Sequence, residues 1–197
     1  KERKGDKGGR GGKEEGEKSS LLRNLAAAAQ LDSRDVPPRQ DPLDLAELVP
    51  RVVARHRPVA RERKVELEFA IPEGPVPITG DVTLLERAIG NLVHNAVRYG
   101  EAGGHVALIL ELEEGRLRLR VLDDGPGVPE AERPRLTQRR FRGEQARTRQ
   151  PAGSGLGLAI AREVAERHGW TMRFEHPDAG GLEVVLEGPL AAETLSG

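Results

Sequence analysis

The sequence predicts an α+β fold, a two-layer α/β sandwich in which helices cover one face of a mixed β-sheet. Apolar residues recur at helical spacing in two segments, and a third segment enters a helix directly after a glycine. Five shorter segments have the pattern of strands, clearest where apolar and polar residues alternate. These segments follow the order helix, strand, helix, two strands, helix, two strands, which indicates a layer of helices packed on a sheet.

The first expected helix covers residues 43–63, and its apolar positions recur at helical spacing. Pro50 and Pro58 must fall near its first turn or at a kink, because proline cannot donate the helical hydrogen bond. A strand follows over residues 65–70, and the proline-bearing segment 72–77 interrupts it. The apolar positions of the helix are Leu45, Leu48, Val49, Val52 and Val53.

The second expected helix runs from the N-cap Asp81 to Tyr99, where Gly100 stops it. Two strands follow at residues 105–113 and 116–122, and a tight turn joins them. The second of these strands alternates cleanly, with three arginines facing away from the core.

Residues 129–154 show neither a strand nor a helix pattern, and we expect them to form a mobile lid. The last helix is expected from Gly155 to His168, ended by the glycine that follows. Strands at residues 171–175 and 182–187 close the domain.

The folded domain is expected at residues 41–190. Residues 1–20 hold only charged residues, glycine and serine, so we expect a flexible tail or linker. Residues 21–40 combine a short apolar helix-forming run with a proline-bearing linker, as at the end of a longer helical hairpin. Residues 191–197 are expected to be a C-terminal tail.

Composition excludes several function classes. The chain has no cysteine, which excludes disulfides and thiolate chemistry. A net charge of -1 and only three Phe, one Tyr and one Trp give no basis for binding nucleic acid. No apolar run approaches the roughly 18 residues of a membrane span, and no signal peptide is recognisable. We therefore expect a soluble, cytoplasmic chain, whose parent protein could still be attached to the membrane.

The polar face of the second helix carries the first candidate site. Asn91 and Asn95 lie one turn apart, with Arg98 beside them. Two amide oxygens next to a guanidinium suit a hydrated Mg²⁺ and the phosphates it bridges. Taken alone, the pattern is more typical of a solvated helix face. The opposite, apolar arc holds Leu85, Ala88, Ile89, Leu92, Ala96 and Tyr99.

A carboxylate on the core side of the sheet is the second candidate. The alternation of residues 116–122 places Asp123 on the apolar face, where no neighbouring basic residue shares it. An unpaired buried carboxylate is costly, and the exocyclic amine of a purine could donate to it. Gly125 and Gly127 allow a flat ligand to approach the backbone. An ordinary Asp-Gly turn explains the segment equally well.

The third candidate is a glycine segment, GSGLGL at residues 153–158, that leads directly into a helix. Its free N–H groups and the positive helix end suit a phosphate, although a glycine loop alone is a weak signal. Upstream, residues 133–154 carry seven arginines and one acid, Glu144, which suits a triphosphate but is also usual in a solvated loop.

In combination, these segments resemble the N, G1, F and G2 boxes of the ATP-binding catalytic domain of sensor histidine kinases. The resemblance covers about residues 43–187. It implies the Bergerat fold, a mixed sheet backed by three helices. The matching segments are NLVHNAVRY at 91–99, DDGPG at 123–127, RFRG at 140–143 and GSGLGL at 153–158.

The resemblance also implies residue roles and the cofactors ATP and Mg²⁺. Asn95 is the implied Mg²⁺ ligand, and Asn91 and Arg98 are implied phosphate contacts. Tyr99 is expected near the nucleoside and Asp123 at the adenine amino group. Arg142 is expected to reach toward the γ-phosphate, and Gly125 and Gly127 to contact the nucleotide. The phosphates are expected to be held by the backbone of Gly153, Ser154, Gly155, Leu156, Gly157 and Leu158.

Family members carry a phosphoaccepting histidine, usually followed by Glu or Asp, on a dimerising helical hairpin. None of the five histidines of this chain has that context, so we expect the acceptor on a hairpin of the same parent protein, upstream of this sequence or on a partner. The resemblance further implies a response regulator as partner and a homodimeric parent. The five histidines are His56, His94, His105, His168 and His176.

Three alternatives remain open from the sequence. Related ATPases and serine kinases share the fold but use a Glu, one turn before the metal-binding Asn, as general base. Asn91 occupies that position and an amide cannot take a proton, which favours an imidazole acceptor over water or serine. A degenerate domain that binds nucleotide weakly and serves as an interaction module is the third alternative.

Overall fold

The computed structural model describes residues 37–113, 115–144, 154–177 and 180–190. The expected tails at 1–20 and 191–197, and the helical run at 21–31, lie outside the described residues. The helices are α2 (Leu45–Arg63), α3 (Val82–Tyr99), the 3-10 helix η1 (Glu130–Arg135) and α5 (Gly157–Arg167). The strands are β1 (Asp41–Asp44), β2 (Glu66–Ala70), β3 (Pro77–Gly80), β4 (His105–Glu113), β5 (Arg116–Asp123), β6 (Thr171–Glu175) and β7 (Leu182–Pro189).

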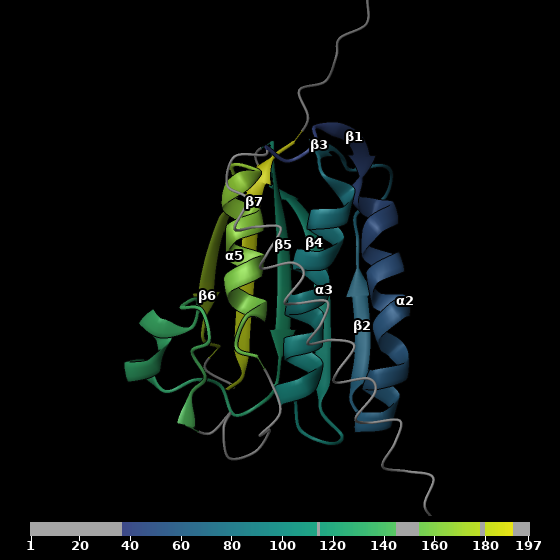
Figure 1. Ribbon diagram of the computed structural model, residues 1–197. Helices are drawn as coiled ribbons and strands as arrows, with labels where there is room; N and C mark the ends of the chain where they lie inside the picture. The colour runs from purple at the N-terminus through teal and green to yellow at the C-terminus, as the bar shows by residue number, and fades with distance from the viewer. Residues whose placement is uncertain (1–36, 114, 145–153, 178–179, 191–197) are drawn as a thin grey trace, which may run out of the picture.

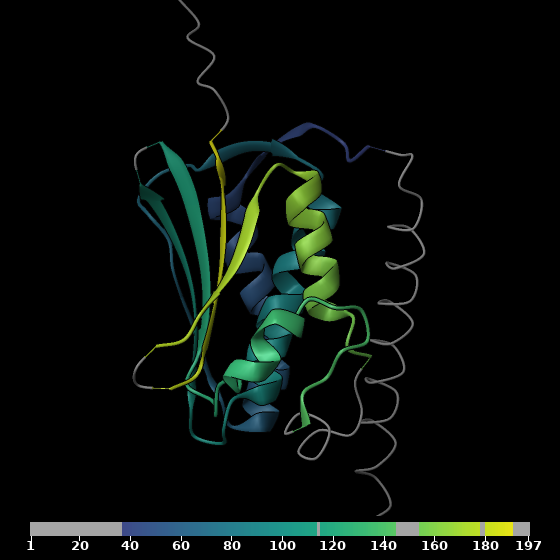
Figure 2. The same cartoon turned by 90° about the vertical axis from the view of Figure 1, so that its left-hand side faces the viewer.

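A mixed five-stranded sheet forms one layer and the three α-helices form the other, which confirms the predicted α+β sandwich (Figure 1, Figure 2). The strand order is β2-β4-β5-β7-β6. Only β2 and β4 run parallel, and the remaining neighbours are antiparallel. The apolar faces of both layers meet in one continuous core.

Helix α2 runs as a single helix through both of its prolines. Pro50 is its sixth residue and Pro58 its fourteenth, so both lie beyond the first turn of the helix. Each proline removes one backbone donor, but four residues from Leu48 to Val53 are buried in the core and hold the helix in place. Asp44 caps its first turn by accepting from the N–H of Ala46 at 2.8 Å.

A second, two-stranded sheet of β1 and β3 was not predicted. It pairs Asp41 with Gly80 and Asp44 with Pro77 in antiparallel register. Both strands have four residues and each contains a proline, so neither shows an alternation that a sequence pattern could reveal. The Asp44 carboxylate, which also accepts from the N–H of Val76 at 2.8 Å, ties this small sheet to the start of α2.

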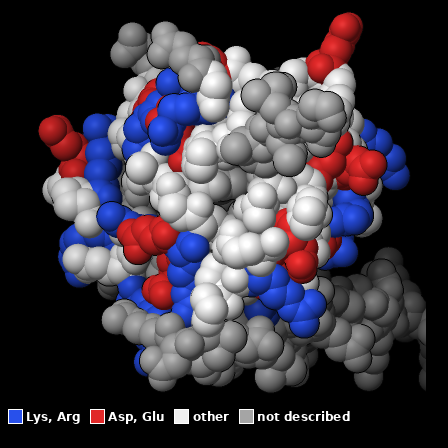
Figure 3. All heavy atoms as spheres, turned by 90° about the horizontal axis from the view of Figure 1, so that it is seen from above, with Lys and Arg blue, Asp and Glu red and all other residues white. Residues whose placement is uncertain are grey.

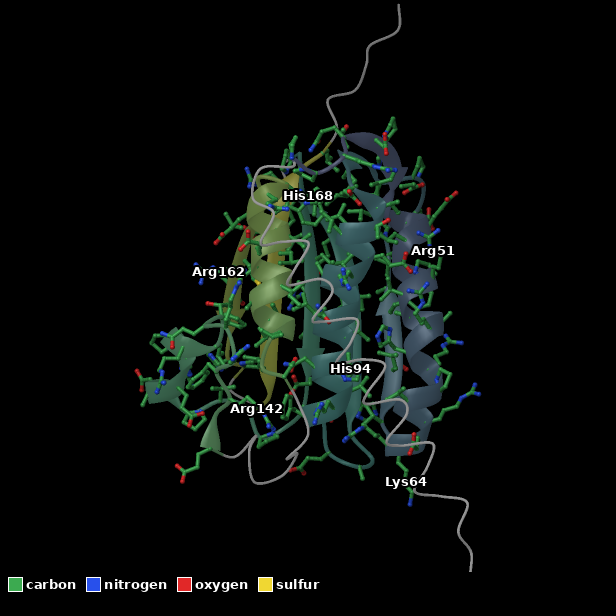
Figure 4. All side chains as sticks on the ribbon, viewed as in Figure 1. Arg51, Lys64, His94, Arg142, Arg162 and His168 are labelled. Atoms are coloured by element: carbon green, nitrogen blue, oxygen red, sulfur yellow. The ribbon has the colours of Figure 1, made fainter. Side chains whose placement is uncertain are left out.

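His168 fixes α5 relative to α3 at the end of the molecule opposite to Arg142 (Figure 4). Its Nδ1 lies 2.7 Å from the carbonyl oxygen of Val164, to which it donates, and Nε2 accepts from the N–H of Asp81 at 3.0 Å. Asp81 in turn caps α3, as predicted, by accepting from the N–H groups of Thr83 and Leu84.

The outer face of the sheet carries rows of paired charges. Arg118 contacts Glu113 and Glu187, and Arg120 contacts Glu111 and Glu183, so the arginines of β5 face away from the core as predicted. At the end of the molecule seen in Figure 3, basic and acidic side chains are likewise interspersed, without a large patch of one sign.

Candidate functional site

Three of the sequence segments that hold candidate site residues converge at one end of the molecule. The last turns of α3, the end of β5 and the start of α5 all lie at the lower end of the view in Figure 1. Figure 4 shows Arg142 at this same end and His94 farther up the face of α3. Residues that are far apart in the chain, such as Asn91 and Gly157, therefore come into contact.

The polar face of α3 is half-buried rather than solvated. Asn91, His94, Asn95 and Arg98 are all partly covered, because α3 packs between α2 and α5. The predicted apolar arc is buried except at Tyr99, which is half-buried. The core contact of α3 also includes Val93 and Val97, which the predicted arc left out.

The side chain of Asn91 has an unsatisfied hydrogen-bond donor at the contact between α3 and α5. Its side-chain nitrogen Nδ2 is buried and has no hydrogen-bond partner among the described residues. The space where a Cβ of Gly157 would stand lies 3.8 Å from Cβ and Cγ of Asn91, so the start of α5 passes directly beside this amide. A buried donor without a partner is costly, and a ligand acceptor at this place would satisfy it.

Asp123 is the titratable group most affected by its surroundings at this end of the sheet. The side chain is half-buried, and burial is the main cause that raises the pKa of the carboxyl from 3.8 to about 6. The N–H of Gly125 donates to Oδ1 at 3.0 Å, and the N–H of Leu182 donates as well, which opposes the rise. The negative charge of Asp124 adds to the rise.

The position of Asp123 on the core side agrees with its predicted place in the strand alternation, but its two donors were not predicted. A ligand amine was the expected donor, whereas the chain itself supplies two N–H groups. One comes from the adjacent turn and the other from β7, whose Leu182 is the register partner of Asp123. A carboxylate has about four acceptor positions, so two backbone donors leave room for a donor from a ligand.

Glycines bring the backbone of this region close together. A Cβ on Gly125 would lie 2.9 Å from the carbonyl oxygen of Tyr99, and one on Gly127, whose φ is 67°, would lie 2.8 Å from that of Gly181. Gly181 was missed by sequence reasoning. Its φ is 88° and a side chain there would overlap the carbonyl of Asp123, so it belongs to the same close-packed loop.

The glycine segment begins its helix later than predicted. Gly155 has a φ of 64°, outside the helical region, and α5 starts at Gly157 instead. Ser154 accepts from the N–H of Leu156 at 3.3 Å, which orders the turn before the helix. Leu156 is buried and Leu158 half-buried, so both side chains anchor the segment, while Gly153 lies outside the described residues.

The arginine-rich segment packs directly on the glycine segment. The N–H of Arg140 donates to the carbonyl of Gly155 at 3.0 Å, and a Cβ on Gly155 would lie 2.8 Å from the carbonyl of Phe141. The guanidinium of Arg135 stacks on the Phe141 ring, 4.4 Å from its centroid. Arg142 is half-buried in the same segment.

One expectation about this segment is wrong. Residues 129–154 were expected to have no regular structure, but η1 occupies Glu130–Arg135. Short 3-10 turns have no apolar periodicity, and none of the residues of η1 is buried, so no pattern reveals it. Residues 145–153, with the two remaining arginines Arg147 and Arg149, lie outside the described residues.

The donor set at this end of the molecule suits a nucleotide better than a metal alone. Within the described ranges, no three His, Cys, Asp or Glu residues are grouped to hold a metal ion. The groups present are amides, arginines, backbone N–H groups and the half-buried carboxylate of Asp123, which match a purine amine and phosphate oxygens. None of the described helices is long and apolar enough to span a membrane.

Similarity to known proteins extends over most of the chain. Residues 80–192 match the family model described as "Histidine kinase-, DNA gyrase B-, and HSP90-like ATPase". Among curated relatives, the sensor-like histidine kinase SenX3 of Mycobacterium tuberculosis is 31% identical over 173 residues, covering 88% of this chain and 42% of the relative. The signal transduction histidine-protein kinase/phosphatase MprB of Mycobacterium avium is 34% identical over 166 residues, covering 84% of this chain and 30% of the relative.

Solved structures agree with the sequence relatives. The mycobacterial sensor histidine kinase MprB superposes with a TM-score of 0.65 at 31% identity, covering 77% of this chain and 97% of that chain. Full-length ShkA in complex with AMPPNP has a TM-score of 0.75 at 29% identity, covering 91% of this chain and 37% of that one. The chain thus spans less than half the length of the curated relatives SenX3 and MprB.

Proposed function

Because the chain belongs to the family of histidine kinase-, DNA gyrase B- and HSP90-like ATPases, we propose that it binds Mg²⁺-ATP and transfers the γ-phosphoryl group to a histidine outside this sequence. The described residues form an ATP-binding catalytic domain of the kind found in sensor histidine kinases. In this proposal the chain supplies the nucleotide site, and a separate helical hairpin supplies the histidine that accepts the phosphoryl group.

The observation that carries the proposal is the Asp123 carboxylate. It lies half-buried at the end of β5 with a raised pKa and with acceptor positions left after its two backbone donors. The exocyclic amine of adenine is a donor of the right kind, and Gly125 has no side chain to keep a flat base away. Asp123 therefore acts as the acceptor that selects adenine, and Tyr99 packs beside the nucleoside.

The phosphates are proposed to lie between α3 and the start of α5. The Asn91 amide, whose nitrogen lacks a partner among the described residues, and Arg98 donate to phosphate oxygens there. The backbone of residues 153–158 donates from the other side, next to Gly157. Arg142 approaches the γ-phosphate. The amide oxygen of Asn95 would hold Mg²⁺, which would neutralise part of the charge of the phosphates.

Histidine is the acceptor that this site serves best. A neutral imidazole already has a free lone pair on one nitrogen, whereas water and serine need a base to remove a proton. The side chain at the position where hydrolytic relatives use Glu is the Asn91 amide, which cannot act as a base. In the transfer, the nitrogen–phosphorus bond forms while the bond from phosphorus to the β–γ bridging oxygen breaks, which releases ADP.

The remaining parts of the system follow from the sensor kinase relatives. We propose that the acceptor is a histidine on a dimerising helical hairpin of the same parent protein, that the parent is a homodimer attached to the membrane through a sensor region, and that a response regulator receives the phosphoryl group. The domain at residues 41–190 then works on the cytoplasmic side. No nucleic acid takes part, in keeping with the near-zero net charge.

The experiment is incubation with ATP labelled at the γ-phosphate, with and without the separately supplied hairpin of the parent protein. We expect no label on this chain alone, slow ATP hydrolysis, and acid-labile label on the hairpin. Acid-stable label on this chain would favour a serine kinase, and rapid phosphate release without the hairpin would favour an ATPase. Absence of ATP binding at millimolar nucleotide would leave only the interaction-module alternative.

A further inference from the structure

Asp124, the residue after Asp123, forms hydrogen bonds with the first residue of the neighbouring strand β4. Its carboxylate oxygen Oδ2 accepts from the backbone N–H of His105, the first residue of β4, at 2.8 Å. In return, the backbone N–H of Asp124 donates to the carbonyl of His105 at 3.3 Å. These two bonds close the end of the β4–β5 ladder immediately after the last register pair, Val106 with Asp123.

The residue before β4 is Gly104, and the position of the Asp124 carboxylate leaves no space there for a side chain. A Cβ built on Gly104 would overlap Oδ1 of Asp124 and would lie 3.0 Å from the carbonyl oxygen of Glu101. The carboxylate of Asp124 therefore packs against the backbone of residues 104 and 105. Any residue other than glycine at position 104 would occupy the space of this carboxylate.

The His105 ring extends this contact to a third strand. Its Nδ1 lies 3.4 Å from Oδ2 of Asp124, and its Nε2 lies 3.1 Å from Oε2 of Glu66 at the start of β2. The side chains of His105, Glu66 and Asp124 are 64%, 61% and 46% exposed, so these contacts of the ring contribute little. The hydrogen bond from the His105 N–H to a carboxylate is charge-assisted and is the stronger contact.

We propose that Asp124 is a positioning residue for nucleotide recognition: by holding the end of β5 on β4, it fixes the direction in which the Asp123 carboxylate points. This rests on the proposed function, since it presumes that Asp123 binds adenine. The chain bends at Gly125, whose N–H donates to the Asp123 carboxylate. Asp124 therefore connects the end of β5 to the bend that contacts Asp123. Without its side chain, the end of β5 loses the hydrogen bond from the His105 N–H and is held on β4 by backbone pairing alone.

The test is calorimetric titration of the whole chain with Mg²⁺-ATP, comparing the wild type with Asp124→Ala, Asp124→Asn and Asp123→Asn. We expect Asp124→Ala to raise the Kd for ATP about tenfold, a size typical of coupled neighbours. Asp124→Asn keeps an oxygen that can accept from the His105 N–H, so it should restore affinity to within about threefold of the wild type. Glu113→Gln, at the opposite end of β4, is the matched control and should leave the Kd unchanged.

A merely structural role is distinguished by a double-mutant cycle. If Asp124 acts through Asp123, adding Asp124→Ala to Asp123→Asn should cost almost no further affinity, whereas independent effects would add. Thermal unfolding checks that each variant is folded at the titration temperature. Unchanged ATP affinity in Asp124→Ala, or additive losses in the cycle, would overturn the positioning role while leaving the proposed function intact. A wild type that does not bind ATP would overturn both.

Discussion

Gly125 lies against the last residue of α3: a Cβ at this position would stand 2.9 Å from the carbonyl oxygen of Tyr99 and 2.8 Å from Oδ1 of Asp123. Both neighbours belong to the proposed nucleotide site. The contact brings the segment after β5 against the end of α3, so the proposed adenine acceptor lies next to the helix that carries Asn91 and Asn95.

Gly125→Ala should therefore damage both folding and nucleotide binding. The backbone carbonyl of Tyr99 cannot move without disturbing α3, so we expect a loss of about 1–3 kcal/mol in the free energy of unfolding, typical of overpacking. Gly157→Ala is the matched control, because a Cβ there would meet Asn91 at an ordinary 3.8 Å. Urea denaturation of the two variants is the measurement, and equal stability losses would contradict the steric argument.

Asp123→Asn should weaken adenine nucleotides much more than guanine nucleotides. The substitution replaces one acceptor oxygen with a donor that faces the adenine amine. Loss of a hydrogen bond to a charged group is worth about 1.5–3 kcal/mol, or about a ten- to hundredfold rise in Kd. Parallel titrations with Mg²⁺-ATP and Mg²⁺-GTP measure it, and an equal loss for both bases would show that Asp123 is only a turn residue.

Local patterns predicted the parts of the site that lie within single elements. The spacing of Asn91 and Asn95 on α3 and the alternation that carries Asp123 to the core side of β5 are properties of one helix and one strand. They could be predicted because each follows from the period of its element.

Contacts between distant segments could not be predicted in this way. The Leu182 donor to Asp123 depends on the register of β5 with β7, and Gly181 is close to Asp123 for the same reason. The turn before α5 likewise contacts a separate segment, because the N–H of Arg140 donates to the carbonyl of Gly155. Such pairings are set by tertiary packing, which leaves no periodic signal in the sequence.

Arg120→Ala should destabilise the domain. Its Nε lies 2.5 Å from Oε1 of Glu183, and Glu183 is only 4% exposed, so removal of the arginine leaves a carboxylate buried without its partner. We expect a loss of about 2–4 kcal/mol in the free energy of unfolding. Arg116→Ala, at an exposed position of the same strand, is the control and should cost less than about 0.5 kcal/mol. Similar urea midpoints for the two variants would contradict this account.

Asp123 also makes the stability of the domain depend on pH. The pKa of this carboxyl is raised from 3.8 to about 6 in the folded chain, so between these values the folded state binds more protons than the unfolded state. Stability then decreases as pH rises through this window, and above pH 6 the folded chain bears the full cost of a buried charge. A rise of this size corresponds to roughly 3 kcal/mol.

Asp123→Asn should remove this cost. Without nucleotide, the variant should have a larger free energy of unfolding than the wild type at pH 8. The difference should become small near pH 4, where the wild-type carboxyl is protonated. Urea denaturation of both proteins across this range measures the difference, and other titrating groups cancel because they are common to both. A raised pKa for Asp123 would be contradicted if the stability gain of the variant over the wild type were the same at pH 8 and pH 4, or smaller at pH 8. The expected trend means that the carboxylate is retained at the expense of stability, as is usual for residues selected for binding rather than for folding.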